Sequence, residues 1–155
     1  MNVDTILVPT DFSQVASAAL SAAEELARLF GAKIVLLHAY HIDVPIQPPG
    51  ITGGLVLPPE FVTSFREEAT RRVDELVDAA KGRGAEITGH VDPAPAHLAI
   101  LAYAEQLPAD LIVMGTRGLT GVKHLMLGSV AERVVRDATC PVLTLKDQEA
   151  EHPAA

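Results

Sequence analysis

The amino-acid sequence predicts an α/β protein whose doubly wound, five-stranded parallel sheet carries helices on both faces. Short apolar runs rich in Val, Ile and Leu alternate with longer amphipathic segments along the whole chain. The apolar runs are nearly continuous, as in strands that are covered on both faces of a parallel sheet. The strictly alternating order, which begins and ends on a strand, favours right-handed crossover connections.

The strands are expected over residues 3–9, 33–39, 85–91, 111–115 and 141–146. A first helix is expected over residues 13–30, where Ser13 can cap the start and Gly31 can end the helix. Its predicted buried stripe consists of Ala16, Ala19, Leu20, Ala23, Ala27 and Phe30.

A second helix is expected over residues 59–81, followed by helices over 96–106 and 129–137. The predicted buried side of the second helix consists of Phe65, Ala69, Val73, Leu76, Val77 and Ala80. On its solvent side, the spacing predicts the ion pairs Glu67–Arg71 and Glu68–Arg72.

The length of 155 residues favours one domain, predicted over residues 1–147 with a flexible tail over 148–155. Within this domain, residues 41–58 are rich in proline and glycine and predict a long loop of the kind that is often functional or mobile.

The charge balance is acidic, with 12 Lys and Arg against 20 Asp and Glu. The basic residues are scattered, whereas a nucleic-acid partner calls for a clustered basic face, so none is expected. No apolar stretch reaches the ~20 residues that span a bilayer, and residues 1–4 do not resemble a secretory signal. The single cysteine, Cys140, cannot form an internal disulfide and is expected to be buried rather than reactive. A cytoplasmic protein is predicted.

A glycine pattern follows the fourth predicted strand. Gly115 and Gly118 precede Gly128 and Ser129 by a spacing of G-x2-G-x9-G-S, and a predicted helix follows. Glycine lets the backbone approach a ligand closely, and a helix start offers unpaired N–H groups and the positive end of a dipole. The pattern therefore predicts a phosphate-binding site.

Other candidates lie at the carboxyl ends of the predicted strands, where open α/β sheets bind their ligands. Pro9, Thr10 and Asp11 follow the first strand, Ala39 ends the second, and Met114 precedes Gly115 on the fourth. If the first and fourth strands are neighbours, Asp11 and the glycine loop face each other across one crevice.

At these residues the chain resembles the ATP-binding branch of the universal stress protein family. The resemblance covers nearly the whole chain and is carried by residues 6–13, 110–118, 127–132 and 140–143. It departs at residues 91–96, where the family's Gly-x-Pro is absent, and no contact is assigned there.

The resemblance implies a site for ATP, or another adenine nucleotide, with Mg²⁺. It implies that Pro9, Thr10 and Asp11 meet the nucleoside, and that backbone groups of Ala39 meet the adenine edge. Met114, Gly115, Arg117 and Gly118 would surround the ribose and phosphates, and Gly128, Ser129 and Val130 would bind the phosphates. It also implies a homodimer through the last strand, from Pro141 to Lys146, with a protein partner that the sequence does not name.

Structural interpretations of the same residues stay open. Ser129 and Glu132 form an S-x-x-E capping box, so Ser129 could only cap its helix. Gly115 and Gly118 could be turn glycines, and Asp11 could cap the first helix. Arg117 could steer phosphates or be solvated. His38, inside an apolar run, is expected to be a packed strand residue.

No nucleophile with an adjacent general base and no common catalytic motif is present. We therefore expect a nucleotide-dependent regulatory protein of the stress response, with slow or no hydrolysis. The alternatives are a nucleotide-independent dimeric interaction module and an enzyme that transfers a nucleotidyl or phosphoryl group.

Overall fold

A computed structural model describes residues 2–41, 58–117 and 127–146 of the chain. Strands and helices alternate along the chain in the order β1 Thr5–Pro9, α1 Gln14–Phe30, β2 Lys33–Ala39, α2 Pro59–Gly82, β3 Ile87–Asp92, α3 Ala96–Gln106, β4 Leu111–Gly115, α4 Ser129–Asp137 and β5 Val142–Leu145. The five strands form one parallel sheet in the order β3-β2-β1-β4-β5. The predicted fold class is confirmed.

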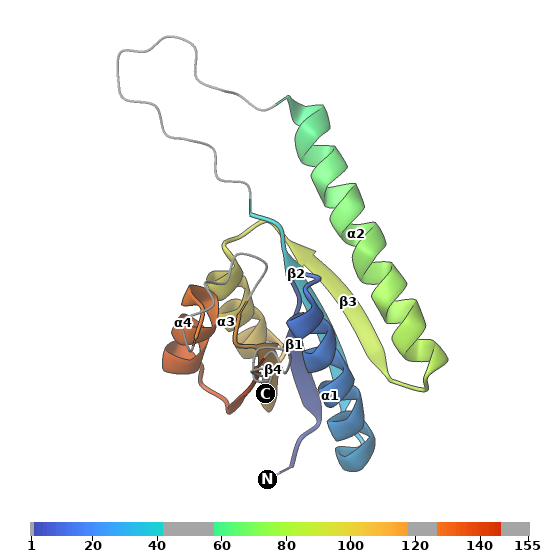
Figure 1. The fold of residues 1–155 in the computed structure, drawn as a ribbon, viewed down its shortest axis with the longest axis vertical. Coiled ribbons are helices and arrows are strands. Elements are labelled where there is room, and N and C mark those ends of the chain that lie inside the picture. The colour runs from blue at the N-terminus through green and yellow to red at the C-terminus, as the bar shows by residue number, and fades with distance from the viewer. Residues whose placement is uncertain (1, 42–57, 118–126, 147–155) are drawn as a thin grey trace, which may run out of the picture.

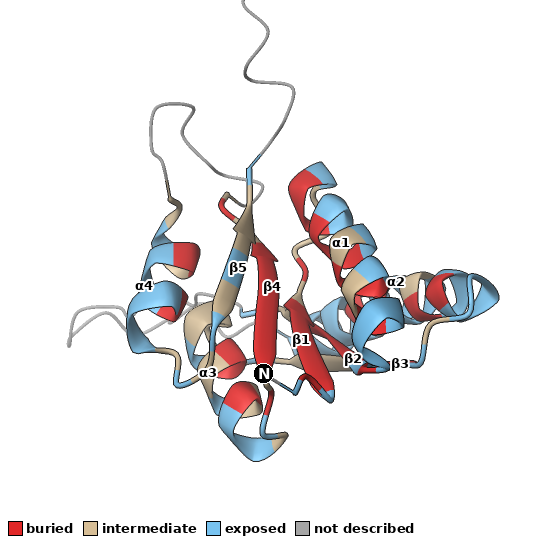
Figure 2. Ribbon diagram, turned by 90° about the horizontal axis from the view of Figure 1, so that it is seen from below, coloured by how far each residue is buried: buried red, intermediate tan, exposed pale blue. Residues whose placement is uncertain are grey.

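Two helix layers cover the sheet (Figure 1). Helices α1 and α2 pack on one face around Ile6, Val8, Ile34 and Leu36, and α3 and α4 pack on the other face around residues that include Leu7. Viewed from below, the buried central strands stand between the two helix pairs (Figure 2). The apolar runs are continuous because every second side chain enters a different core.

Local end signals place the first helix as the sequence predicts. Ser13 has an extended backbone, and its side chain accepts a hydrogen bond from Ala16 N at 3.2 Å. Gly31 ends the helix at φ 71°, in the left-handed region that glycine adopts without strain. The predicted core position of Phe30 is wrong, because this last helical residue is exposed.

Helix α2 is buried only in its second half. Val73 and Val77 pack on the sheet as predicted, but Phe65 is exposed, which contradicts its predicted core position. The first half of α2 runs past the sheet, so its apolar side meets no strand there (Figure 1). The predicted helix and its apolar side are therefore correct, but the predicted length of the side that the sheet buries is wrong.

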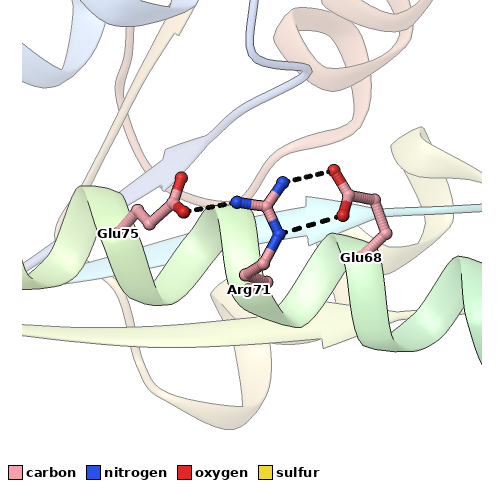
Figure 3. Close-up of polar contacts among 3 residues, drawn as sticks. All are labelled: Glu68, Arg71 and Glu75. Atoms are coloured by element: carbon pink, nitrogen blue, oxygen red, sulfur yellow. Dashed lines mark hydrogen bonds and ion pairs between the residues drawn. The ribbon is translucent and has the colours of Figure 1, made fainter.

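The solvent-side ion pairs of α2 differ from the predicted ones. Arg71 binds Glu68 with two hydrogen bonds and also pairs with Glu75, one turn further along (Figure 3). The predicted pairs Glu67–Arg71 and Glu68–Arg72 do not form: Arg71 pairs with Glu68 and Glu75 instead, and Arg72 lies over the ring of Phe12.

Within the described ranges, none of the helices is both long enough and apolar enough to cross a membrane. Most of the predicted loop 41–58 and the predicted tail 148–155 lie outside the described residues.

Candidate functional site

The first and fourth strands are neighbours, as the crevice hypothesis required. β1 pairs with β2 on one side and with β4 on the other, so the strand order reverses between β1 and β4. An open α/β sheet binds its ligands outside the carboxyl ends of the strands at such a point. The segment from Pro9 to Asp11 and the segment from Met114 to Arg117 both lie at this edge.

A backbone hydrogen bond brings the two ends of the glycine pattern together. The N–H of Gly128 donates to the carbonyl of Thr116 at 2.7 Å, and the N–H of Thr116 donates to the carbonyl of Leu145 at 2.8 Å. Thr116 is buried. The start of α4 is thereby held against the carboxyl end of β4, next to the central strand of the sheet.

The start of α4 carries no side-chain cap. Gly128, with φ −73° and ψ 160°, is the N-cap residue, and Ser129 is the first residue of the helix. The predicted capping box is therefore wrong: Ser129 stands inside the helix, where its hydroxyl cannot cap it. A helix that begins on glycine leaves its first N–H groups to a ligand or to water. Val130 is half-buried behind this start, and Ser129 is exposed.

Packing alone explains why residue 115 is a glycine. A Cβ atom added to it would lie 2.8 Å from Cγ1 of Val15 on α1 and 3.3 Å from the carbonyl oxygen of Arg117. An added Cβ on Gly128 would lie 3.3 Å from the carbonyl oxygen of Thr116. Gly115 thus lets α1 approach β4, whatever binds in the crevice.

The segment that follows β1 is held by short-range hydrogen bonds. The carboxylate of Asp11 accepts from the N–H of Ser13 at 3.0 Å, and the hydroxyl of Thr10 accepts from the N–H of Phe12 at 3.0 Å. Asp11 therefore precedes the helix cap, which is Ser13. Phe12 has φ 65°, the left-handed region that bulky residues rarely adopt.

His38 holds the same segment from β2. Its Nδ1 lies 2.8 Å from the carbonyl oxygen of Thr10, so the ring donates there. Burial lowers the pKa of His38 below 6.5, and the guanidinium of Arg72 lowers it further, whereas the Thr10 hydrogen bond and the Asp11 carboxylate oppose the shift. His38 is half-buried, as the packed-strand interpretation predicts.

The remaining predicted site residues fall in three places. Ala39 is half-buried at the end of β2, beside the Pro9–Asp11 segment. Arg117 is half-buried two residues after β4. Gly118 lies outside the described residues.

Sequence reasoning missed Phe12, Thr116 and Arg72 as members of this region. Only Thr116 had a local signal, its place between the glycines of the pattern. Cys140, expected to be buried, is half-buried, and burial raises the pKa of its thiol. In the part of the chain that the structure describes, no three His, Cys, Asp or Glu side chains gather closely enough to hold a metal ion.

Comparison with known proteins places the chain in a family. Residues 2–146 match the universal stress protein family. The chain belongs to the universal stress protein family. It is 36% identical over 147 residues to the universal stress protein MJ0531 of Methanocaldococcus jannaschii, covering 94% of this chain and 84% of that protein. It is 34% identical over 146 residues to the universal stress protein YxiE of Bacillus subtilis, covering 91% of this chain and 97% of the relative.

Solved structures of the family share this fold. The universal stress protein UspA of Lactobacillus plantarum has a TM-score of 0.77 at 25% identity and covers 94% of this chain and 99% of its own. A universal stress protein in complex with cAMP has a TM-score of 0.65 at 26% identity, covering 94% and 98%. A family member from Archaeoglobus fulgidus in complex with dAMP has a TM-score of 0.61 at 25% identity, covering 93% and 98%. Some structural neighbours of this chain therefore bind adenine nucleotides.

Proposed function

We propose that this universal stress protein binds ATP, or another adenine nucleotide, in the crevice between β1 and β4. The observation that carries the proposal is the hydrogen bond from Gly128 to Thr116, which holds the uncapped start of α4 against the end of β4. The cAMP and dAMP complexes of similar structures support the same ligand class.

We assign the contacts as the resemblance to the family implies. Phosphates bind at the start of α4, where the N–H groups of Ser129 and Val130 make no backbone hydrogen bond to another described residue and the Ser129 hydroxyl lies beside them. Asp11 accepts hydrogen bonds from the nucleoside, with Pro9 and Thr10 beside it, and Ala39 meets the adenine edge. Met114, Gly115 and Arg117 border the ribose and phosphates, and the resemblance assigns the same role to Gly118, which lies outside the described residues.

A bound triphosphate brings Mg²⁺ with it, because Mg²⁺ is held largely by substrate phosphates and water rather than by protein cages. The Ser129 hydroxyl is the oxygen group at the start of α4 that would complete its coordination. The ion neutralises phosphate charge in a protein that is itself acidic.

The function we propose is regulatory, with slow or no hydrolysis. The ligand changes the surface that the protein offers to a protein partner, in a cytoplasmic stress response. Support comes from the crevice, where the oxygens of Thr10 and Asp11 accept backbone N–H groups and His38 Nδ1 binds a backbone carbonyl rather than a nucleophile. The lone Cys140 is in keeping with a reducing compartment.

We further propose a homodimer through β5, within the segment Pro141 to Lys146. β5 is an edge strand of the sheet, and an unpaired strand edge is a template for pairing with another chain. Leu143 is a large apolar side chain exposed on this strand.

The site is tested by calorimetry of Mg-ATP and AMP with wild type and Gly128→Val. Valine can adopt the extended backbone of Gly128, but its Cβ would lie 3.3 Å from the Thr116 carbonyl oxygen, so the stability of the variant is measured together with its affinity. We expect at least a tenfold loss of affinity. Gly82→Val is the matched control, since an added Cβ there has nothing within 4 Å, and it should bind like wild type.

Two results would overturn the proposal. One is a wild-type protein that binds no adenine nucleotide. The other is equal affinity in wild type and Gly128→Val. Turnover of ATP well above ~1 per second would favour the enzyme alternative, because ordinary enzymes begin near that rate.

A further inference from the structure

Phe12 is the one bulky residue with a positive φ among the described residues. Its φ of 65° places it in the left-handed region, and the other positive values belong to Gly31 and Gly84. A non-glycine residue costs energy there, and such strain persists only where the surroundings hold it. Phe12 directly follows Asp11, so the strained residue is the chain neighbour of the residue that we propose binds the nucleoside.

The N–H, the carbonyl and the hydroxyl of Thr10, the residue two before Phe12, each form a hydrogen bond. The N–H of Thr10 donates to the carbonyl of Leu37 at 2.8 Å, and its carbonyl accepts from His38 at 2.8 Å. Its hydroxyl accepts the N–H of Phe12 at 3.0 Å. The direction in which the chain leaves β1 is therefore determined by β2 and by Thr10 itself.

The ring of Phe12 is held from two further elements. The His38 ring of β2 lies 4.3 Å away between centroids, tilted by 40°. The guanidinium carbon of Arg72, on α2, lies 3.9 Å from the Phe12 centroid, in cation–π geometry. The neighbouring Arg71 instead pairs with Glu68 and Glu75 on the exposed side of α2.

We propose that Phe12, His38 and Arg72 are positioning residues of the nucleotide site: their stack holds the left-handed turn that orients Asp11. The inference rests on the proposed function, since it concerns how tightly the same site binds. It also gives α2 a role, because Arg72 is the contact through which this helix reaches the ligand segment. The three residues act through Asp11 and are assigned no contact with the ligand.

The first test compares Arg72→Ala, Arg72→Lys and the control Arg71→Ala by calorimetry with AMP and with ATP. A cation–π contact of this kind corresponds to about a two- to fivefold change in affinity. We expect Arg72→Ala to lose about that much. Arg72→Lys keeps a cation over the ring and should recover most of it, and Arg71→Ala, which removes only the exposed pairs, should bind like wild type.

The choice of ligands separates positioning from direct charge attraction. A guanidinium that attracted phosphates would lose more affinity for ATP than for AMP when it is removed. A positioning residue acts on the nucleoside that the two ligands share, so the fold loss should be equal for both. A loss that grows with the number of phosphates would overturn the proposal.

The second test compares Phe12→Ala with Phe12→Gly. Both remove the ring, but glycine relieves the left-handed strain. Phe12→Gly should therefore unfold at a higher denaturant concentration than Phe12→Ala and yet bind AMP no more tightly. A purely structural role predicts the opposite, an affinity that rises with stability, and that result would overturn the inference.

Failure of this inference and failure of the proposed function give different results. Wild type that binds no nucleotide refutes the function. Wild type that binds, loses affinity in Gly128→Val and binds unchanged in Arg72→Ala and Phe12→Ala refutes only the positioning role.

Discussion

The two described glycines of the G-x2-G-x9-G-S pattern serve different physical purposes. A side chain on Gly115 would collide with Val15 of α1, so this glycine is needed for packing. Gly128 has an ordinary extended backbone, and because it has no side chain, no side-chain cap binds the N–H groups at the start of α4. A Cβ atom on Gly115 would lie 2.8 Å from Val15, whereas one on Gly128 would come no closer than 3.3 Å to its neighbours, so the ligand hypothesis is tested at Gly128 with the stability of the variant as a control.

At the same scale, His38 predicts a pH dependence of stability. Burial lowers its pKa in the folded protein below the value of 6.5 expected when unfolded. Below that value the unfolded chain binds more protons at this residue than the folded one, so stability falls as the pH falls. The stability that neutral His38 contributes is fully present above pH 6.5 and is lost as the pH falls through the folded pKa.

The variant His38→Asn isolates this contribution. Its amide nitrogen can still donate to the Thr10 carbonyl, but it does not titrate. We expect the free energy of unfolding, measured in urea at several pH values, to fall more steeply for wild type than for His38→Asn below pH 6.5. Parallel pH profiles would contradict the assignment.

At the scale of elements, α2 is anchored at its second half and free of the sheet at its first. Its final turn is tied to α1 where Arg83 binds the buried carboxylate of Glu24 with two hydrogen bonds, at 2.9 and 2.5 Å. Val73 and Val77 pack over Gly89 of β3. Arg72 lies in this anchored half, so its contact with Phe12 belongs to the part of the helix that packs on the sheet.

The close approach of α2 to β3 depends on Gly89. A Cβ atom there would lie 2.4 Å from Cγ1 of Val73 and 2.9 Å from Cγ2 of Val77. Over-packing of this kind costs about 1–3 kcal/mol, so Gly89→Ala should lower the free energy of unfolding by that amount in urea titrations. Gly82→Ala, with open space around its Cβ, is the control and should change stability little.

A double variant tests the cause. Val73→Ala removes the methyl group that Gly89→Ala would meet, so the two losses should sum to more than the loss of the double variant. If the two losses of unfolding free energy simply add, the contact with Val73 is not the cause of the Gly89→Ala destabilisation.

At the scale of the molecule, the two edge strands of the sheet differ in what packs on them. β3 is an edge strand on which α2 packs closely, and β5 is the opposite edge, with Leu143 exposed. The central strands β1 and β4 are buried on both faces (Figure 2). β5 is therefore the edge strand that carries an exposed large apolar side chain.

Leu143→Lys tests this assembly. A charged side chain on the edge strand opposes strand-to-strand association, so the mass from light scattering after gel filtration should fall from dimer to monomer. Leu29→Lys alters a leucine that is even more exposed, at the far end of α1, and should leave the mass unchanged. A monomeric wild type, or a dimeric Leu143→Lys, would refute the proposed interface.

The sequence by itself determined the features that depend on neighbouring residues. The strands and helices follow from apolar periodicity, and the ends of α1 follow from Ser13 and Gly31, because capping and a positive φ are local properties. The spacing of Gly115 and Gly128 likewise predicted that a helix start follows β4.

Only the tertiary structure decided what depends on distances between remote segments. An S-x-x-E pattern cannot tell whether Gly128 or Ser129 caps α4, because the cap is set by the bond to Thr116. A helical stripe shows which side of α2 is apolar but not where the sheet beneath it ends, and so Phe65 is exposed. The contact of Arg72 with Phe12 joins residues sixty positions apart, and no local pattern encodes it.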